Sequence, residues 1–184
     1  MASERGYVMA LTIRVLASVT ALLMVTYGYG HAQVPESPEA QCDVTPPNGI
    51  TAGREQPSPA SHGNAELSTS LFPDGTVTFR PMGPGFVTAN GSLGIKWPWM
   101  RGVRGQVKVK GRRLDAKAPR LRADIPPPSY YGDFGFTPSY LIFPTPGCWE
   151  VTAHVGNRKA SKLTFVTRVV KIGEGPGRYD PPRR

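Results

Sequence analysis

Proline and glycine divide most of the chain into short segments in which apolar and polar residues alternate. The sequence has 20 prolines and 21 glycines, and they follow no fixed period. Alternation with a period of two is typical of half-buried strands, and turn residues between such segments are typical of an all-β domain. Beyond the N-terminal region, no window carries a sustained apolar stripe at helical spacing. The sequence therefore predicts an all-β, antiparallel β-sandwich of about seven or eight strands.

Two turn signals predict hairpins in the first half of this domain. One is the Pro-Asp-Gly sequence within residues 66–80, and the other is Asn90-Gly91 within residues 85–99. Asn-Gly is the strongest short hairpin signal because both residues tolerate a positive φ. Pro98 indicates an edge strand or the end of strand pairing, because proline has no backbone N–H to donate.

The second half is predicted to contain an exposed strand, a crossing loop and a closing hairpin. In residues 106–113, two valines alternate with two lysines and an arginine. The proline-rich residues 114–138 predict a long crossing loop. Residues 148–155 and 162–172 alternate on either side of a turn, and they predict a hairpin whose first strand buries Trp149.

The N-terminus has the features of a secretory signal peptide, predicted to comprise residues 1–32. The uncharged apolar residues 15–27 follow a short basic stretch, and Gly30 and Ala32 are small residues at positions suited to a signal peptidase. A membrane anchor is the alternative, but the apolar run is shorter than the roughly 20 residues that span a bilayer. The mature chain would begin at Gln33 and be secreted or periplasmic.

The mature chain is predicted to have three parts. Residues 33–65 are rich in proline, serine and glycine and predict an irregular leader. Residues 66–172 are predicted to form the β-sandwich, and residues 173–184 a disordered tail.

Cys42 and Cys148 are the two cysteines of the chain. In an oxidising compartment, an isolated pair most often forms a disulfide, which would hold the leader to the strand that begins at Cys148. Two separate thiols are the alternative. A zinc site is less favoured, since the mature chain has no Cys-x-x-Cys pair and only His62 and His154. We predict no metal site and no cofactor.

Residues 143–155 read Phe-Pro-Thr-Pro-Gly-Cys-Trp-Glu-Val-Thr-Ala-His-Val. With the turn and alternating strand that follow, they resemble the last two strands of exported bacterial immunoglobulin-like β-sandwich domains. More broadly, residues 40–172 are similar to uncharacterised exported bacterial proteins of this type. The resemblance implies an immunoglobulin-like fold and export. It implies no reaction, because a fold does not determine a function.

Sequence motifs for catalysis are absent from the mature chain. It contains no Gly-x-Ser-x-Gly, Ser-x-x-Lys or His-Glu-x-x-His. The remaining enzymatic hypothesis is an envelope carbohydrate-active or hydrolytic enzyme with its site in residues 114–138. In that site, Asp115 would converge with Asp124 or Asp133.

Trp97 and Trp99 fall on one face of their segment, together with Leu93 and Ile95. Exposed tryptophans on a β-sandwich can stack on sugar rings, so the pair is a candidate aromatic platform. The alternative, which the shared face favours, places both rings in the core.

Basic residues are concentrated in residues 101–122, which carry nine basic residues and one acidic residue, a net charge of +8. The whole mature chain, with 20 basic and 12 acidic residues, has the same net charge. The candidates for binding an anionic partner are Arg101, Arg104, Lys108, Lys110, Arg112 and Arg113. Such a patch would attract an anionic envelope polymer, a lipid head group or an acidic protein. A face that only maintains solubility is the alternative, and nucleic acid is not expected because no recognition motif is present.

Together, these features predict an exported, non-catalytic β-sandwich that binds or scaffolds at the cell envelope.

Overall fold

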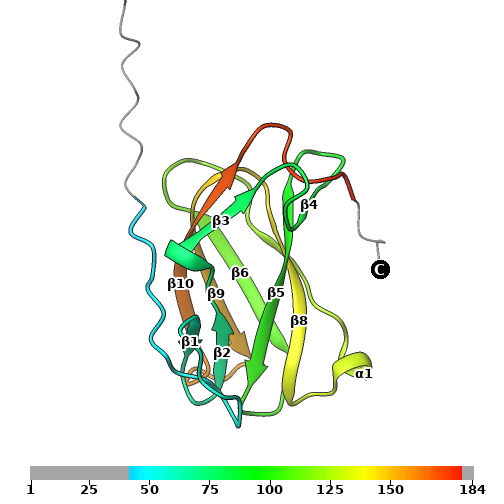
Figure 1. The fold of residues 1–184 in the computed structure, drawn as a ribbon. Coiled ribbons are helices and arrows are strands. Elements are labelled where there is room, and N and C mark those ends of the chain that lie inside the picture. Colours follow the sequence, from blue (N-terminus) through cyan, green and yellow to red (C-terminus); the bar gives the residue numbers. More distant parts are fainter. Residues whose placement is uncertain (1–41, 180–184) are drawn as a thin grey trace, which may run out of the picture. The chain divides into compact units, whose positions relative to one another are not determined.

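A computed structural model describes residues 42–179 (Figure 1). The predicted signal peptide, its cleavage site and the first part of the leader lie outside the described residues, as does the end of the predicted tail, residues 180–184.

The described residues form two packed β-sheets, which confirms the predicted all-β sandwich (Figure 1). The larger sheet has the order β1-β2-β5-β8-β7, with β4 paired to β5. Its strands are β1 (Ser61–Gly63), β2 (Leu67–Ser70), β4 (Phe86–Val87), β5 (Leu93–Arg101), β7 (Arg122–Asp124) and β8 (Gly135–Phe143).

The smaller sheet has the order β3-β10-β9-β6. Its strands are β3 (Thr76–Phe79), β6 (Val107–Arg113), β9 (Gly147–Val155) and β10 (Leu163–Lys171). The described residues thus contain ten strands, more than predicted. The additional ones, β1 and β7, are three residues long, which is too short for an alternating pattern to be recognised.

The chain crosses from the larger sheet to the smaller one between β2 and β3. The Pro-Asp-Gly sequence forms a single 3₁₀ turn, η1 (Pro73–Gly75), in which Asp74 has a φ of 53°. The hairpin predicted here is wrong, because β3 pairs in parallel with β10, the last strand among the described residues. The Pro-Asp-Gly sequence does form a turn, as predicted. The partner of β3 lies about 90 residues further along the sequence, too far for a local pattern to indicate it.

The other two predicted hairpins are confirmed. Asn90-Gly91 forms the turn between β4 and β5, with Gly91 at a φ of 84°. Strands β9 and β10 pair antiparallel along almost their whole length. The residues of β9 that were predicted to face the core are fully buried: Trp149, Val151, Ala153 and Val155.

Strand β5 lies in the middle of its sheet, so the edge strand suggested by Pro98 is wrong. Pro98 lies opposite Pro138 of β8, which places two residues without an N–H at one pair of ladder positions. On the other side of β5, β2 pairs with residues 99–101 and β4 with residues 93–94. Pairing of β2 with β5 therefore ends at Pro98. This confirms the other alternative that Pro98 indicated, the end of strand pairing.

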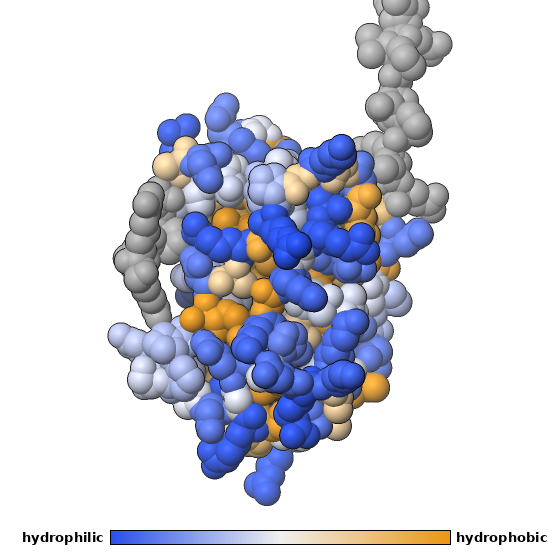
Figure 2. Space-filling model, turned by 180° about the vertical axis from the view of Figure 1, so that it is seen from behind, coloured by the Kyte–Doolittle hydropathy of each residue, from blue (hydrophilic) through white to orange (hydrophobic). Residues whose placement is uncertain are grey.

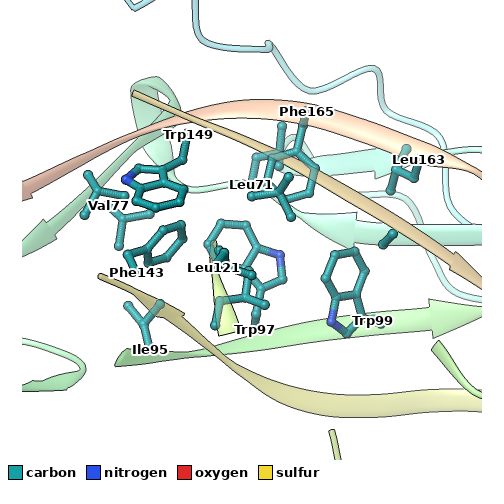
Figure 3. Packing of buried hydrophobic residues seen from close by; sticks show 14 of the residues in the cluster. Leu71, Val77, Ile95, Trp97, Trp99, Leu121, Phe143, Trp149, Leu163 and Phe165 are labelled. Carbon is teal, nitrogen blue, oxygen red and sulfur yellow. The ribbon is translucent and has the colours of Figure 1, made fainter. Parts of the chain in front are cut away.

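Aromatic rings from both sheets meet in the core (Figure 3). Trp97 of β5 stacks on Phe165 of β10, with ring centroids 5.4 Å apart and planes 11° apart. Phe143 of β8 meets Trp149 of β9 edge to face at 5.7 Å. Such pairs add to the free energy of burial, so the aromatic residues contribute strongly to holding the two sheets together.

The described part of the leader is attached to the sandwich. Cys42 and Cys148 form a disulfide with their Cα atoms 5.5 Å apart, which confirms the predicted pairing. The Thr45 N–H donates to the Val166 carbonyl at 3.0 Å, beyond the part of β10 that β3 covers. The first strand begins at Ser61, before the predicted start of the sandwich at residue 66.

The proline-rich segment and the tail are more ordered than predicted. Residues 114–138 contain β7 and one helical turn, α1 (Pro128–Tyr131). In the tail, the Val87 N–H donates to the Gly177 carbonyl at 3.1 Å, and the Tyr179 N–H donates to the Val87 carbonyl at 3.0 Å. The prediction of disorder is wrong for residues 173–179, because the short strand β4 offers them an edge with which to pair.

Replacing either cysteine by alanine should lower the free energy of unfolding by a similar amount, since each change removes the same link. Chain-entropy arguments give at most about 4.7 kcal/mol for a closed loop of about 100 residues. Denaturant unfolding of Cys42→Ala, Cys148→Ala and the double variant measures the effect. A double variant much less stable than both single variants would show that the two side chains act separately.

Thr69→Val should destabilise the protein although the two side chains have nearly the same shape. Thr69 Oγ1 accepts from Trp97 Nε1 at 2.8 Å and donates to the Pro98 carbonyl at 2.7 Å. Leaving these buried groups without a partner costs about 1–3 kcal/mol. The matched control, Thr78→Val on β3, should change stability by less than about 0.5 kcal/mol. Identical denaturation curves for Thr69→Val and the unaltered protein would contradict this account.

Candidate functional site

Strand β6 separates basic from apolar side chains. Lys108, Lys110 and Arg112 are exposed, whereas Val107 is 1% exposed and belongs to the core. The strand is an edge of the smaller sheet. Three of the six candidate residues thus form an outward row, Lys108, Lys110 and Arg112, which we call the basic face.

Three arginines of the candidate set form ion pairs. They are Arg104 with Asp133 (2.7 Å), Arg112 with Glu150 (2.9 Å) and Arg113 with Asp115 (2.6 Å). In the third pair both side chains are largely covered, and the hydrogen bond from Arg113 holds the pKa of Asp115 below its usual value. Surface ion pairs contribute only about 0–1 kcal/mol to stability. Their main effect here is to reduce the positive charge of the patch.

Arg101 lies inside the protein, so its assignment to the basic surface was wrong. Only 2% of the surface of Arg101 is exposed to solvent. Its guanidinium donates, at 3.0 to 3.3 Å, to the carbonyl oxygens of Gly105, Tyr131, Gly132, Phe134, Gly135 and Phe136. Burial lowers the pKa of Arg101, but a guanidinium remains charged in proteins. This cation therefore organises the backbone around it and is not available to an anionic partner.

The described residues still carry an excess of positive charge. Residues 42–179 contain 18 Lys and Arg and 9 Asp and Glu, a net charge of +9. Seen from behind, the surface is dominated by hydrophilic residues with smaller apolar patches between them (Figure 2). Lys108 donates to Asn157 Oδ1 at 3.2 Å. Within residues 42–179, neither Lys108 nor Lys110 forms an ion pair, so both keep their charge available.

Burial excludes Trp97 and Trp99 from an exposed aromatic platform, since each is 1% exposed. Their indole N–H groups donate to Thr69 and Ser139 inside the protein. Sequence reasoning missed a different group of exposed rings, which are Tyr130, Tyr131, Phe134 and Phe136. The available signal is the presence of four aromatic residues among residues 130–136, within the predicted crossing loop.

The described residues give no support to the enzymatic hypothesis. Asp115, Asp124 and Asp133 each pair with a different arginine. Residues 42–179 contain no group of three or more His, Cys, Asp or Glu side chains that could hold a metal ion. His62 is buried, and burial lowers its pKa, while His154 Nδ1 lies 2.7 Å from a backbone carbonyl.

Two of the cavities on the described part of the sandwich are of similar size. One, of about 390 Å³, is lined in part by Lys171 and Glu174, and the other, of about 350 Å³, by Phe86, Lys96 and Tyr140. Neither brings together two carboxylates, or a histidine and a carboxylate, as general acid–base catalysis commonly requires.

No protein-family model, curated protein or solved structure matches this chain. In the part of the chain that the structure describes, no helix has the length and apolar character needed to cross a membrane. The disulfide is compatible with an oxidising, extracytoplasmic compartment.

Arg101→Lys and Arg101→Met should each destabilise the protein by about 3 kcal/mol or more. Hydrogen bonds to a charged group contribute about 1.5–3 kcal/mol each, and lysine has three donors where arginine has five. Amide hydrogen exchange in residues 130–136 should become faster in both variants.

The matched control is Arg104→Ala, whose side chain is 78% exposed and which should cost less than about 1 kcal/mol. An Arg101→Lys protein with unchanged stability and unchanged exchange would show that the geometry of the guanidinium is not needed.

Proposed function

We propose that this protein is an exported, non-catalytic β-sandwich module that attaches to an anionic surface of the cell envelope. The observation that carries the proposal is the basic face on strand β6. Lys108 and Lys110 point outward because Val109, the residue between them, packs against the core. The partner would be an anionic envelope polymer, a lipid head group or an acidic protein.

Export is supported by the signal-peptide features of residues 1–32 and by the disulfide between Cys42 and Cys148. A secreted or periplasmic location would bring the basic face into contact with the charged polymers and lipids outside the cytoplasm. The resemblance of residues 143–155 to exported bacterial sandwich domains is in keeping with this location.

Lysines on an edge strand have a second effect, since they discourage pairing with another sheet edge. Protection against aggregation requires only that the edge be charged. Attachment requires in addition that charge reversal at these positions weaken binding more than the same reversal elsewhere. The test is therefore a comparison of two variants with equal net charge.

Lys108→Glu/Lys110→Glu should weaken binding to polyphosphate and to phosphatidylglycerol vesicles by roughly tenfold or more, since each lysine near an anionic surface contributes about 1 kcal/mol. The matched control is Lys96→Glu/Lys171→Glu, which changes the net charge equally at two other exposed sites. Binding should also fall steeply with added salt, because the screening length decreases from about 8 Å to about 3 Å at 1 M. Sedimentation with each anionic probe measures binding.

Equal loss in the two variants would mean that net charge alone matters and that the basic face is not a binding site. Absence of binding to both probes at low salt would overturn the proposal as a whole.

A further inference from the structure

Four aromatic side chains are exposed on residues 130–136, which we call the aromatic loop. Tyr130 is 72% exposed, Tyr131 44%, Phe134 51% and Phe136 47%. Two of these rings, Tyr131 and Phe136, are in contact, and exposed apolar side chains that gather in one place commonly mark a site that meets a partner. The loop runs from α1 into β8, at the end of the sandwich opposite β4 (Figure 1).

Arg101 fixes the backbone of the aromatic loop. Five of the six carbonyl oxygens bound by its guanidinium belong to residues 131–136. Gly132 and Gly135, with φ of 63° and 73°, permit the turns that bring these carbonyls inward. Because the carbonyls point to a buried cation, the rings are displayed on an ordered backbone while they remain exposed to solvent.

The geometry of the rings argues against a sugar-stacking platform. Tyr131 and Phe136 meet edge to face, with centroids 6.0 Å apart and planes 73° apart. A pair in this arrangement presents no common plane to a flat sugar ring. Aromatic side chains that carry hydroxyl groups are instead suited to the boundary between the head groups and the hydrocarbon of a bilayer, where tyrosine is enriched.

The turns around the aromatic loop carry positive charge. The Gly105 N–H donates to the Asp133 carbonyl at 2.7 Å, and Arg104 binds the Asp133 carboxylate, so the β5–β6 turn contacts the loop. The bond from Lys108 to Asn157 brings the β9–β10 turn to the same end. The exposed cations of these segments are Arg104, Lys108, Arg158, Lys159 and Lys162. Arg104 and Arg158 are paired with Asp133 and Glu66, so the lysines carry the charge that is outside ion pairs.

We propose that the aromatic loop inserts into the interfacial region of an anionic lipid bilayer, while the neighbouring cations and the basic face bind the head groups. This inference rests on the proposed function and identifies lipid as the anionic partner. Peripheral proteins commonly need two weak signals for stable attachment, apolar insertion and electrostatic attraction. The aromatic loop would supply the first and the lysines the second.

Phe134→Trp places a fluorescent probe in the aromatic loop. The native Trp97, Trp99 and Trp149 are buried, so their emission provides a constant background from the core. The variant is mixed with vesicles of phosphatidylcholine and phosphatidylglycerol, whose acyl chains are either unmodified or brominated. We expect the emission to shift to the blue on binding and to be quenched by the brominated chains. The matched control, Ile172→Trp, lies at a site 52% exposed in the wild type, on the residue after β10, and should show neither effect.

A second pair of variants measures the contribution of the rings. Tyr131→Ser/Phe134→Ser should lower affinity for the mixed vesicles by roughly tenfold or more. Ile50→Ser/Ile172→Ser, which removes side chains of similar exposure elsewhere, should leave that affinity unchanged. Binding to polyphosphate should be the same in both, because it depends on charge alone.

Three other outcomes would each overturn part or all of the proposal. Binding to vesicles without quenching of Phe134→Trp would overturn insertion and leave the proposed function standing, with the basic face as its only basis. Binding to polyphosphate but not to vesicles would overturn the lipid partner and likewise leave the proposed function. Loss of binding to both probes would overturn both proposals.

Discussion

The contact between Trp97 and Phe165 is the interaction on which the rest of the structure depends. It joins β5 of the larger sheet to β10 of the smaller one, with ring centroids 5.4 Å apart. Large buried rings supply much of the free energy that holds two sheets face to face. Side chains alternate along a strand, so the residues next to a buried ring point to the opposite face. Lys96 and Pro98, on either side of buried Trp97, are exposed for this reason. The core therefore decides which residues the surface can offer to a partner.

The basic residues concentrated in residues 101–122 do not all contribute positive charge to the surface. Residues 101–122 contain nine basic residues, but Arg101 is buried, and four other arginines of the run are held by carboxylates. The arginines satisfy oxygen atoms of the protein, a task for which a planar guanidinium with five donors is well suited. The two lysines of β6 are exposed and outside ion pairs. Arg120 is an exception, since it is exposed and forms no ion pair within residues 42–179. Among the other basic residues of the run, the distinction between arginine and lysine separates the structural part from the part available for binding.

The sequence predicted those features that depend on local periodicity. The closing hairpin, the Asn90-Gly91 turn and the outward lysines of β6 each follow from alternation or from turn chemistry within a few residues. Features that depend on a distant partner were missed. The parallel pairing of β3 with β10, and the pairing of the tail with β4, join segments with no shared local pattern. The candidate site was predicted in its outward row, Lys108, Lys110 and Arg112, but not in the burial of Arg101. That burial depends on the backbone conformation of residues 131–136, for which the sequence has no recognisable motif.

The position of Arg101 in β5 explains why the aromatic loop exists in this form. Ile95, Trp97, Trp99 and Arg101 all point inward, because they are two residues apart along one strand. The first three meet the core, whereas the fourth comes at the end of the strand, where the chain turns toward β6. An apolar side chain at that position would leave the carbonyls of residues 131–136 without donors in a site shielded from water, at a cost of about 1–3 kcal/mol for each. The guanidinium of Arg101 donates hydrogen bonds to five of these carbonyl oxygens at once. The loop can therefore direct its carbonyl groups toward the interior. With these carbonyls directed inward to Arg101, the aromatic side chains of residues 130–136 lie on the surface. The alternation that places Trp97 and Trp99 in the core therefore also places Arg101 where it holds the aromatic loop, and through it the four exposed rings.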